Sequence, residues 1–476
     1  MIELENISFQ YDGTETESLK NVSLSVQEGE CVLLTGASGC GKTSLIRVIN
    51  GLIPHFYEGS LTGHARLLGM EIKDKEPHEL APIVGSVFQN PRTQFFTTDT
   101  DSELTFGMEN CGVPYEEMHQ RYNDTIRQLK LEKLTHRDIF ALSGGEKQQI
   151  AFGSVYALLP QVYVLDEPSA NLDYAAIERL KEMLLFLKTQ GKTILIAEHR
   201  LYYLREIADR IVLMENGSIS HIYPTQELTR APAVELNELG LRAFYHEEVN
   251  VSNAAAPVKP VLEVKHLAAS YKKGQSVFSE VNITVGQGEI LGVTGPNGQG
   301  KTTLVHTICG LRKETSGEVC FCGRAVKQKK RSKHAYLVMQ DPNYQLFSDS
   351  VEEELKLSLS GTQPGEKERN EILEALNLKE LKQRHPLSLS GGQKQRLSIA
   401  LAALNPAEVL IFDEPTSGLD YQNMCRVADM LRLLSQRGKA ILLVSHDNEF
   451  LSPVCNRIVA LGYQETEIVL RVGLKH

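Results

Sequence analysis

The sequence predicts an α/β protein made of two similar domains in tandem, each built around a mixed or mostly parallel β-sheet. The first observation is that a strand, a glycine-rich loop and a helix follow one another twice. CVLLTG (31–36) and EILGVTG (289–295) are short apolar runs, and the helical spacing of apolar residues follows at 44–52 and 303–311. The second is that VYVLDE (162–167) and VLIFDE (409–414) are apolar runs that end in carboxylates, which is typical of strands buried on both faces of a parallel sheet.

A third observation is that four motifs recur in the same order. GASGCGKT (36–43) returns as GPNGQGKT (295–302), and three later motifs return at a constant spacing of 247 residues: LSGGEKQQ as LSGGQKQR, VLDEPSANLD as IFDEPTSGLD, and AEH as VSH. Repeats of this kind indicate a duplicated structural unit. We therefore expect a first domain with its C-terminal tail over 1–245, a linker over 246–260 and a second domain over 261–476.

Composition limits the classes of function. The 476 residues are 42% apolar and 23% charged, with a formal charge of −10, which is typical of globular domains and argues against nucleic-acid binding through bulk positive charge. No apolar run is long enough to span a bilayer, and the N-terminus has no signal-peptide pattern. We therefore expect a cytoplasmic protein that reaches a membrane only through a partner.

The two glycine-rich loops have the pattern GxxxxGK[ST], and we call residues 36–43 and 295–302 the P-loops. Their backbone N–H groups can surround phosphate at a helix N-terminus, the lysine can reach the β- and γ-phosphates, and the hydroxyl can bind Mg²⁺. A chance glycine loop is disfavoured, because the strand and helix are in place twice. The predicted ATP-binding residues are Gly36, Ser38, Gly39, Gly41, Lys42, Thr43, Ser44, Gly295, Asn297, Gly298, Gly300, Lys301, Thr302 and Thr303.

Carboxylates at two strand ends complete the expected chemistry. Asp166 and Asp413 are placed to hold Mg²⁺ together with Thr43 and Thr302, and Glu167 and Glu414 follow directly, where they can orient or deprotonate the attacking water. A solvated strand end is the alternative for an isolated Asp-Glu pair. The P-loops make the catalytic interpretation the better one.

LSGGE (142–146) and LSGGQ (389–393), here called the signatures, each open a helical stretch. A serine followed by two glycines exposes backbone N–H donors at a helix start, which predicts a second anion site in each half. Because each half already has a P-loop, we expect each signature to cover the nucleotide of the other half. The residues concerned are Ser143, Gly144, Gly145, Ser390, Gly391 and Gly392.

With these motifs in place, nearly the whole chain resembles the nucleotide-binding domains of ABC ATPases. The resemblance implies a sheet core and a helical subdomain in each half, two domains paired head-to-tail around two ATP molecules, and two hydrolytic sites. Ser143 and Gly145 would then serve the ATP at Lys301, and Ser390 and Gly392 the ATP at Lys42. It also implies the following roles: adenine-stacking Tyr11 and Tyr271; glutamines Gln89 and Gln340, which sense Mg²⁺ and the water; switch histidines His199 and His446; and Asp173 and Asp420, in loops that cross between the sites.

The glutamines begin two similar segments, FQNPRTQFFT (88–97) and MQDPNYQLFS (339–348), here called the Q-loop segments. Asn90 and Asp341 are good N-caps with proline behind them, so we expect two short helices. These helices would present Gln94, Phe95, Phe96, Gln345, Leu346 and Phe347 to a membrane partner. The alternative is that these apolar side chains pack into their own domain.

The motifs QNPxxQFF and QDPxxQLF, together with ELTFGMEN (103–110) and GLIPHFYEG (51–59), resemble those of the ATPases of energy-coupling factor transporters. That resemblance implies ATP- and Mg²⁺-dependent import of a vitamin or metal ion from the cytoplasmic face of the membrane. The partners would be an integral membrane coupling protein and, through it, a substrate-binding membrane protein. The second half of the chain lacks the FGxEN motif that the first half has at 106–110.

Three other functions remain open: a soluble twin-ABC ATPase acting on ribosomes or DNA, the fused ATPase of another ABC importer, and a nucleotide-binding scaffold. The short, weakly charged linker and the acidic balance disfavour the first. The intact catalytic residues of both halves disfavour the second, where one half is commonly degenerate. Glu167 and Glu414 oppose the third.

Overall fold

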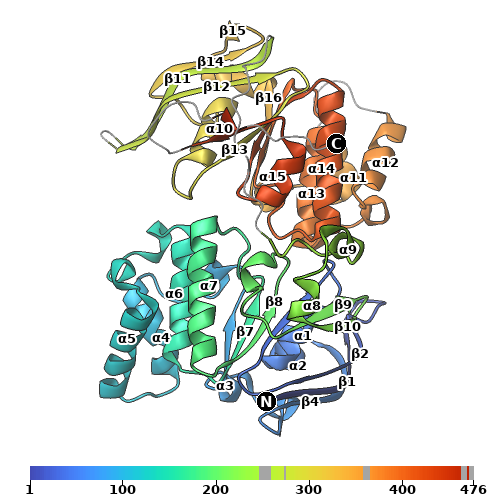
Figure 1. Cartoon of the computed structure of the whole chain (residues 1–476). Helices are drawn as coiled ribbons and strands as arrows, with labels where there is room; N and C mark the ends of the chain where they lie inside the picture. The colour runs from blue at the N-terminus through green and yellow to red at the C-terminus, as the bar shows by residue number, and fades with distance from the viewer. Residues whose placement is uncertain (246–258, 273–274, 358–364, 462–468, 471–476) are drawn as a thin grey trace. The chain divides into compact units, whose positions relative to one another are not determined.

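The computed structural model describes residues 1–245, 259–272, 275–357, 365–461 and 469–470, so the expected linker lies almost wholly outside the described residues. The chain divides into two compact units, Met1–Tyr245 and His246–His476 (Figure 1). Each unit contains one six-stranded and one four-stranded sheet, with helices between and beside them. The α/β class expected from the sequence is confirmed.

The six-stranded sheet of the first unit has the order β10-β9-β3-β8-β7-β6. Its inner strands are parallel and almost fully buried, and only β10 pairs antiparallel, at the edge. Apolar runs without alternation give such strands because both faces are covered. The strands are β3 Cys31–Gly36, β6 Val84–Val87, β7 Val162–Asp166, β8 Thr193–Ala197, β9 Arg210–Glu215 and β10 Ser218–Pro224.

The four-stranded sheet of the first unit is antiparallel, with the order β2-β1-β4-β5. One core joins its inner face to α1 and to one face of the six-stranded sheet. The P-loop helix α1 is therefore enclosed by apolar side chains, which fixes the loop that precedes it. The strands are β1 Ile2–Tyr11, β2 Leu19–Val26, β4 Gly59–Leu67 and β5 Met70–Glu71, and α1 is Lys42–Ile49.

The other face of the six-stranded sheet is covered by a helical layer with its own core. Helices α4 and α5 pack on α6, and α6 packs beside α7 (Figure 1). Helices α2 and α3 instead contribute Ile53 and Leu80 to the core around α1. The helices of the unit other than α1 are α2 Leu52–His55, α3 Pro77–Leu80, α4 Thr100–Asn110, α5 Tyr115–Leu129, α6 Gly144–Ala157, α7 Tyr174–Thr189, α8 Thr225–Leu228 and α9 Ala233–Glu238.

The second unit repeats this plan. Its sheets have the orders β16-β17-β18-β13-β19-β20 and β12-β11-β14-β15. Its strands are β11 Pro260–Lys272, β12 Gln275–Gly286, β13 Ile290–Thr294, β14 Ser316–Phe321, β15 Arg324–Ala325, β16 Ala335–Val338, β17 Val409–Asp413, β18 Ala440–Val444, β19 Arg457–Ala460 and β20 Val469–Leu470. Its helices are α10 Lys301–Cys309, α11 Val351–Leu357, α12 Glu366–Ala375, α13 Gly391–Leu404, α14 Tyr421–Gln436 and α15 Asn448–Val454.

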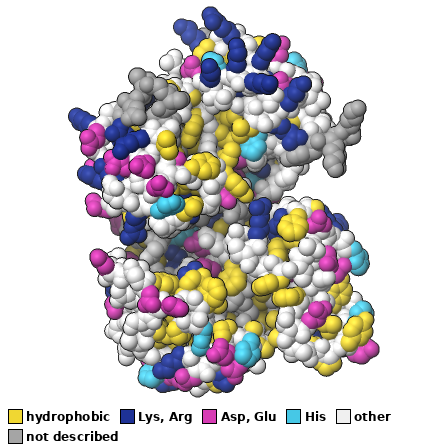
Figure 2. Space-filling model, turned by 180° about the vertical axis from the view of Figure 1, so that it is seen from behind, with side chains coloured by type: hydrophobic (Ala, Val, Ile, Leu, Met, Phe, Trp, Pro, Cys, Tyr) yellow, Lys and Arg dark blue, Asp and Glu magenta, His cyan; other side chains and the backbone are white. Residues whose placement is uncertain are grey.

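The surface charge of the second unit is uneven although the whole chain is acidic. Lys and Arg side chains gather at the end of this unit that carries β15, seen at the top of Figure 2. The exposed cations of the segment 324–333 are Arg324, Lys327, Lys329, Lys330 and Lys333. Within the described ranges, no helix is both long and apolar enough to cross a membrane.

Candidate functional site

The P-loop of the first unit wraps around its own lysine. Gly41 precedes α1 with φ 106°, and a Cβ there would lie 2.7 Å from the Ser18 carbonyl oxygen, so only glycine fits. The buried Lys42 ammonium donates to the carbonyls of Gly36 (3.0 Å) and Ala37 (3.1 Å). The loop is thus closed over a positive charge at a helix N-terminus, as a phosphate site requires.

The second P-loop has the same geometry. Lys301 Nζ donates to the carbonyls of Gly295 (2.6 Å) and Pro296 (2.8 Å), and α10 begins at this lysine. A Cβ on Gly295 would lie 2.3 Å from the Leu461 carbonyl oxygen. Both loops therefore depend on glycine for close backbone packing, and both present a buried lysine.

A hydroxyl and a buried aspartate meet beside each loop. Thr43 Oγ1 donates to Asp166 Oδ1 at 3.2 Å. Burial and the neighbouring Glu167 charge raise the pKa of Asp166 to about 6. Burial likewise raises the pKa of Asp413, against a hydrogen bond from Thr302.

These hydroxyl–carboxylate pairs fit Mg²⁺. Oxygen ligands are what Mg²⁺ prefers, and a cation there would offset the cost of keeping a buried carboxylate charged. Thr43 with Asp166, and Thr302 with Asp413, are therefore the side chains that would hold the ion.

The glutamates that follow these aspartates have a strained backbone. Glu167 has φ 45° and Glu414 has φ 51°, in the left-handed region that residues with a side chain rarely occupy. Their amides donate to the carbonyls of Ala197 (2.8 Å) and Val444 (2.9 Å) on the neighbouring strand. Strain of this kind costs on the order of 1–3 kcal/mol and concentrates at functional sites.

A glutamine and a histidine converge on the glutamate of the first unit. Gln89 Nε2 donates to Glu167 Oε2 at 2.7 Å, and His199 Nε2 lies 3.3 Å from Glu167 Oε1. The three residues follow β6, β7 and β8, which are adjacent in the sheet, so they meet at its carboxyl edge.

The histidine of the first unit is buried beside this glutamate. His199 is 6% exposed, and its Nε2 makes no hydrogen bond within the part of the chain that the structure describes. In the second unit, His446 Nε2 lies 3.2 Å from Glu414 Oε1. The strand before each histidine is paired in parallel with the strand before the P-loop, so the imidazole and the P-loop are at the same edge of the sheet. A buried imidazole at this edge is a suitable donor for a γ-phosphate.

The signatures form capped helix starts. Ser143 Oγ accepts from the Glu146 amide (3.3 Å), and Glu146 Oε2 accepts from the Ser143 amide (2.7 Å). Ser390 and Gln393 exchange the same two bonds. The glycine directly after each serine, Gly144 or Gly391, is exposed, and a Cβ on Gly391 would meet nothing within 4 Å. The next glycine of the first signature, Gly145, is buried, and a Cβ there would lie 2.8 Å from Ala176 Cβ.

Comparison with known proteins agrees with this geometry. The chain matches the ABC transporter family model over residues 19–170 and 278–417.

The chain belongs to the ABC transporter family. It is an ATPase with tandem ATP-binding domains that uses ATP and Mg²⁺.

Two relatives match this ABC ATPase over nearly its whole length. A Treponema denticola protein named "Putative ABC transporter ATP-binding protein" is 46% identical over 97% of this chain and 95% of its own. A Bacillus subtilis protein named "Putative HMP/thiamine import ATP-binding protein YkoD" is 32% identical over 97% and 90%.

Among solved structures, archaeal ribosome recycling factor aABCE1, in complex with ribosomal stalk protein aP1, has a TM-score of 0.63. The match covers 96% of this chain and 87% of the aABCE1 structure's chain, at 21% sequence identity. At that identity it shows the fold alone.

Other predicted ATP-site residues of the ABC ATPase are also near the P-loops or at helix starts. Tyr11 lies with its hydroxyl 3.0 Å from Ser44 Oγ and accepts a hydrogen bond from Arg47 (2.9 Å). Asp173 and Asp420 are the N-caps of α7 and α14, where each carboxylate accepts a backbone N–H. The Tyr271 side chain lies outside the described residues.

The Q-loop segments differ from expectation in one respect. Asn90 and Asp341 do cap through their side chains, but each helix is a single 3-10 turn, Pro91–Thr93 or Pro342–Tyr344. The predicted helices through residues 94–96 and 345–347 are therefore wrong. The reason is that Gln94 and Gln345 turn inward and bond the backbone, which ends the turn.

The structure sorts the six candidate contact residues. Gln94 accepts from the Phe88 amide at 3.3 Å, and Gln345 accepts from the Met339 amide at 2.8 Å. Phe95 packs against the core and Leu346 is 3% exposed. The side chains exposed to solvent are Phe96 (75%) and Phe347 (80%). Phe96 also stacks on Phe106 of α4 with ring centroids 4.9 Å apart.

Sequence reasoning missed Glu198, a buried carboxylate of the first unit. It precedes His199 and accepts four hydrogen bonds, although it is 2% exposed. It missed the capping residues Glu146 and Gln393 as well. The S-x-x-E/Q pattern at each signature was the signal that could have found these two.

Burial opposes ionisation of Glu146, yet hydrogen bonds from Ser143 and the Arg137 charge keep the pKa of this carboxyl below its ordinary value. Arg137 Nη1 donates to Glu146 Oε1 at 2.8 Å. The first signature is thus held by a charged cap, whereas the second is held by the neutral Gln393.

Proposed function

We propose that this ABC ATPase powers the import of a micronutrient, a vitamin or a transition-metal ion, as the two-headed ATPase of an energy-coupling factor transporter. The observation that carries the proposal is the pair of exposed phenylalanines, Phe96 and Phe347, at the same place in both units. Each follows the Q-loop glutamine by seven residues. The Bacillus subtilis relative named for HMP/thiamine import supports a vitamin as the cargo.

In the proposed cycle, each ATP is bound by one half and covered by the other. The P-loop with Lys42 would share its nucleotide with Ser390 and Gly392, and the P-loop with Lys301 would share its nucleotide with Ser143 and its neighbours. The exposed glycine at the start of each signature helix supports this arrangement, because the N–H groups and helix dipole there favour an anion.

Hydrolysis in each half would use the glutamate after the strand. Glu167 would take a proton from water as the water oxygen attacks the γ-phosphorus, which gives ADP and phosphate. Gln89 would hold the carboxylate in place, and His199 would donate to the γ-phosphate. Mg²⁺, when bound by Thr43 and Asp166, neutralises phosphate charge.

Contacts inside each unit suggest how the nucleotide state reaches the exposed phenylalanines. In the first unit, Gln94 Nε2 donates to the Ser86 carbonyl of β6 (3.3 Å) and to the Ala151 carbonyl of α6 (3.5 Å). In the second, Lys394 of α13 donates to Asn343 Oδ1 at 2.9 Å. Each Q-loop segment is therefore tied to the helix that starts at a signature.

We propose that Phe96 and Phe347 insert into an integral membrane coupling protein, which works with a substrate-binding membrane protein. An exposed aromatic ring is costly in water and is a typical interface anchor. The ATPase would then lie peripherally on the cytoplasmic face of the membrane. Gln94, Phe95, Gln345 and Leu346 would support the two rings from inside.

Affinity capture from detergent-solubilised native membranes tests this proposal. The wild-type chain should retain a small integral membrane protein, identified by mass spectrometry, and the double variant Phe96→Ala with Phe347→Ala should lose it. Tyr115→Ala with Leu311→Ala is the matched control, since these side chains are 71% and 58% exposed outside the Q-loop segments. Capture of ribosomes or other soluble complexes in place of a membrane protein would contradict the proposal.

A further inference from the structure

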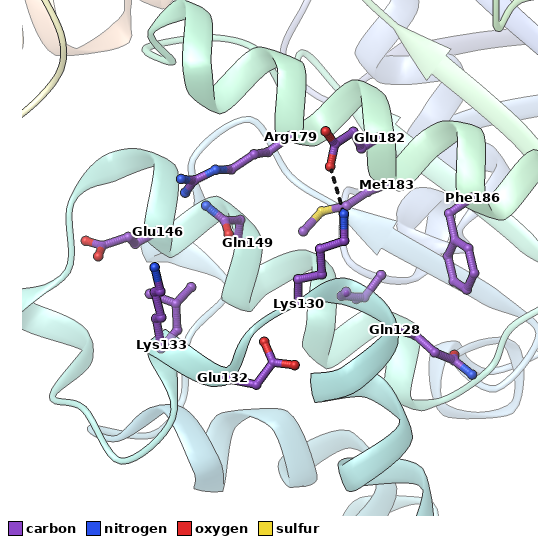
Figure 3. Close-up of a pocket in the computed structure, with 12 residues that line it drawn as sticks. Gln128, Lys130, Glu132, Lys133, Glu146, Gln149, Arg179, Glu182, Met183 and Phe186 are labelled. Carbon is purple, nitrogen blue, oxygen red and sulfur yellow. Dashed lines mark ion pairs between the residues drawn. The ribbon is translucent and has the colours of Figure 1, made fainter.

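The first unit contains a pocket that no step of the ATPase cycle uses. Its volume is about 570 Å³, and it lies between the end of α5, the start of α6 and the middle of α7 (Figure 3). Lys130 Nζ and Glu182 Oε2 lie 3.7 Å apart across it. The lining also includes two further cations and two further carboxylates: Lys133, Arg179, Glu132 and Glu146.

The second unit shows what the same place holds in the repeat. Gln149 and Leu129 line the pocket, and their counterparts 247 residues on are Arg396 and Leu376. Arg396 Nε donates to the Leu376 carbonyl at 2.9 Å, and Arg396 is 4% exposed. A buried guanidinium group therefore joins the signature helix to the preceding helix in the second unit.

In the first unit, Leu129 and Gln149 occupy these two positions, so the arginine is absent. The shorter Gln149 donates instead to the Gly145 carbonyl one turn back, at 3.4 Å. Leu129 is the last residue of α5, and the final carbonyls of a helix lack intrahelical partners and carry partial negative charge. The lining contains three cationic and three carboxylate side chains. The partial negative charge expected at the C-terminal end of α5 therefore favours a cation in this pocket.

We propose that this pocket binds a guanidinium group, supplied by a small metabolite or by an arginine side chain of a partner protein. The planar N–H donors would bond the carbonyl end of α5 as Arg396 does in the second unit, with carboxylates of the lining nearby. The volume is within the range of about 300–1,000 Å³ that is usual for small-ligand sites. A compact ammonium group lacks the planar donor arrangement and would fit less well.

The position of the pocket gives such a ligand a way to act. Glu146 lines the pocket and also accepts the hydrogen bond of the Ser143 amide at the first signature. The other oxygen of this carboxylate, Glu146 Oε1, accepts from Arg137 at 2.8 Å, so a bound guanidinium group would compete with Arg137 for it. Binding is therefore expected to change how the first signature is held.

Binding of methylguanidinium to the full-length protein tests the proposal. We expect saturable binding by calorimetry or ligand-observed NMR at millimolar concentration, and at least tenfold weaker binding to the variant Gln149→Arg, whose own side chain would fill the pocket. Methylammonium is the matched control and should not bind saturably. Equal binding to wild type and Gln149→Arg, or equal binding of methylammonium, would overturn the proposal.

The reverse change in the second unit supplies an independent readout. Arg396→Gln should lower the melting temperature, because it removes a buried hydrogen bond, and methylguanidinium should restore part of the loss. Binding to Arg396→Gln but not to wild type would show that only the second unit forms such a site, and would overturn the proposal. Free arginine binding tenfold more tightly than the peptide Gly-Arg-Gly-Gly would indicate a metabolite; the opposite ranking would indicate a partner protein.

Discussion

In the first unit the residue before the switch histidine is Glu198, whereas in the second unit it is Ser445. The buried Glu198 carboxylate accepts from the amides of His199 (2.7 Å), Arg200 (3.1 Å) and Ser169 (3.2 Å), and from the Tyr203 hydroxyl (2.9 Å). Burial and the Glu198 charge raise the pKa of Tyr203 well above its usual value, so this hydroxyl stays a donor.

The serine of the second unit makes a different set of contacts. Ser445 Oγ donates to Glu414 Oε2 at 3.3 Å and accepts from the Asp447 amide at 3.1 Å, and the His446 amide lies 3.4 Å from the same glutamate oxygen. The histidine loop of the second unit is thus tied to Glu414, the proposed general base of this half.

The difference indicates that two sites with the same proposed catalytic residues need not respond alike. In the first unit, Glu198 ties the histidine loop to Ser169, which lies in the loop leading to Asp173. In the second unit, the histidine loop is tied to Glu414 itself. The imidazole lies beside the glutamate in both halves, at 3.3 Å in the first and 3.2 Å in the second. A movement of the histidine backbone should therefore also carry the Asp173 loop in the first half, and act on Glu414 through a second contact in the second half.

The largest expected effect comes from removing both proposed catalytic carboxylates, Glu167 and Glu414. Glu167→Gln with Glu414→Gln should lower kcat for ATP hydrolysis by about 10²–10⁴-fold, because general-base catalysis contributes a factor of that size, while ATP binding remains. Each single variant should keep at least ten times the rate of the double variant, measured by phosphate release. If one single variant were as slow as the double variant, two independently active sites would be ruled out.

A smaller effect is expected from the residues before the histidines. Glu198→Ala leaves four buried donors without their acceptor and should lower the free energy of unfolding of the first unit by about 3 kcal/mol or more. Ser445→Ala, the matched control in the second unit, should cost about 1 kcal/mol.

Urea unfolding with hydrogen exchange of the Ser169 and His199 amides measures both variants. Fast exchange at Ser169 is expected in Glu198→Ala alone. Similar losses in both variants would mean that the two loops are held with equal strength.

The smallest effect is a pH dependence. The pKa of Asp166 is about 6 in the folded chain, raised by burial and Glu167, against about 4 when unfolded. The contribution of Asp166 to the stability of the fold is therefore fully present below the pKa of the unfolded chain and is lost as pH rises through the folded pKa of about 6. Asp166→Asn should stabilise the nucleotide-free protein increasingly as pH rises, because the asparagine side chain carries no charge.

The gain of Asp166→Asn over wild type should grow by about 1–2 kcal/mol between pH 5 and pH 8. Denaturant unfolding without Mg²⁺ at both pH values measures it. Asp413→Asn should show the same sign, because burial also raises the pKa of Asp413. A gain that shrank as pH rose would contradict the burial argument.

Most elements of the fold could be predicted from short sequence patterns. The P-loops, the strands ending at Asp166 and Asp413 and the helix starts at both signatures could be predicted because each depends on residues only a few positions apart. The N-caps of the Q-loop segments were predictable for the same reason.

Contacts between distant segments could not be predicted. Glu198 bonds the Ser169 amide, 29 positions earlier, and no local spacing encodes that contact. The inward turn of Gln94 and Gln345 was not predicted either, although their bonds to the Phe88 and Met339 amides join residues only six positions apart. The contact of Gln94 with the Ala151 carbonyl does join distant segments. Burial of Leu346 beside exposed Phe347 likewise follows from packing, since both residues are apolar.

The central claim, that both Q-loop segments contact a membrane coupling protein, is tested most directly by crosslinking. Photoreactive benzoylphenylalanine placed at position 96 or 347 should, in cells that make this protein, form a crosslink to the same integral membrane protein from both positions. The same probe at position 115 should not. Crosslinks from 96 and 347 only to soluble or ribosomal proteins would contradict the account.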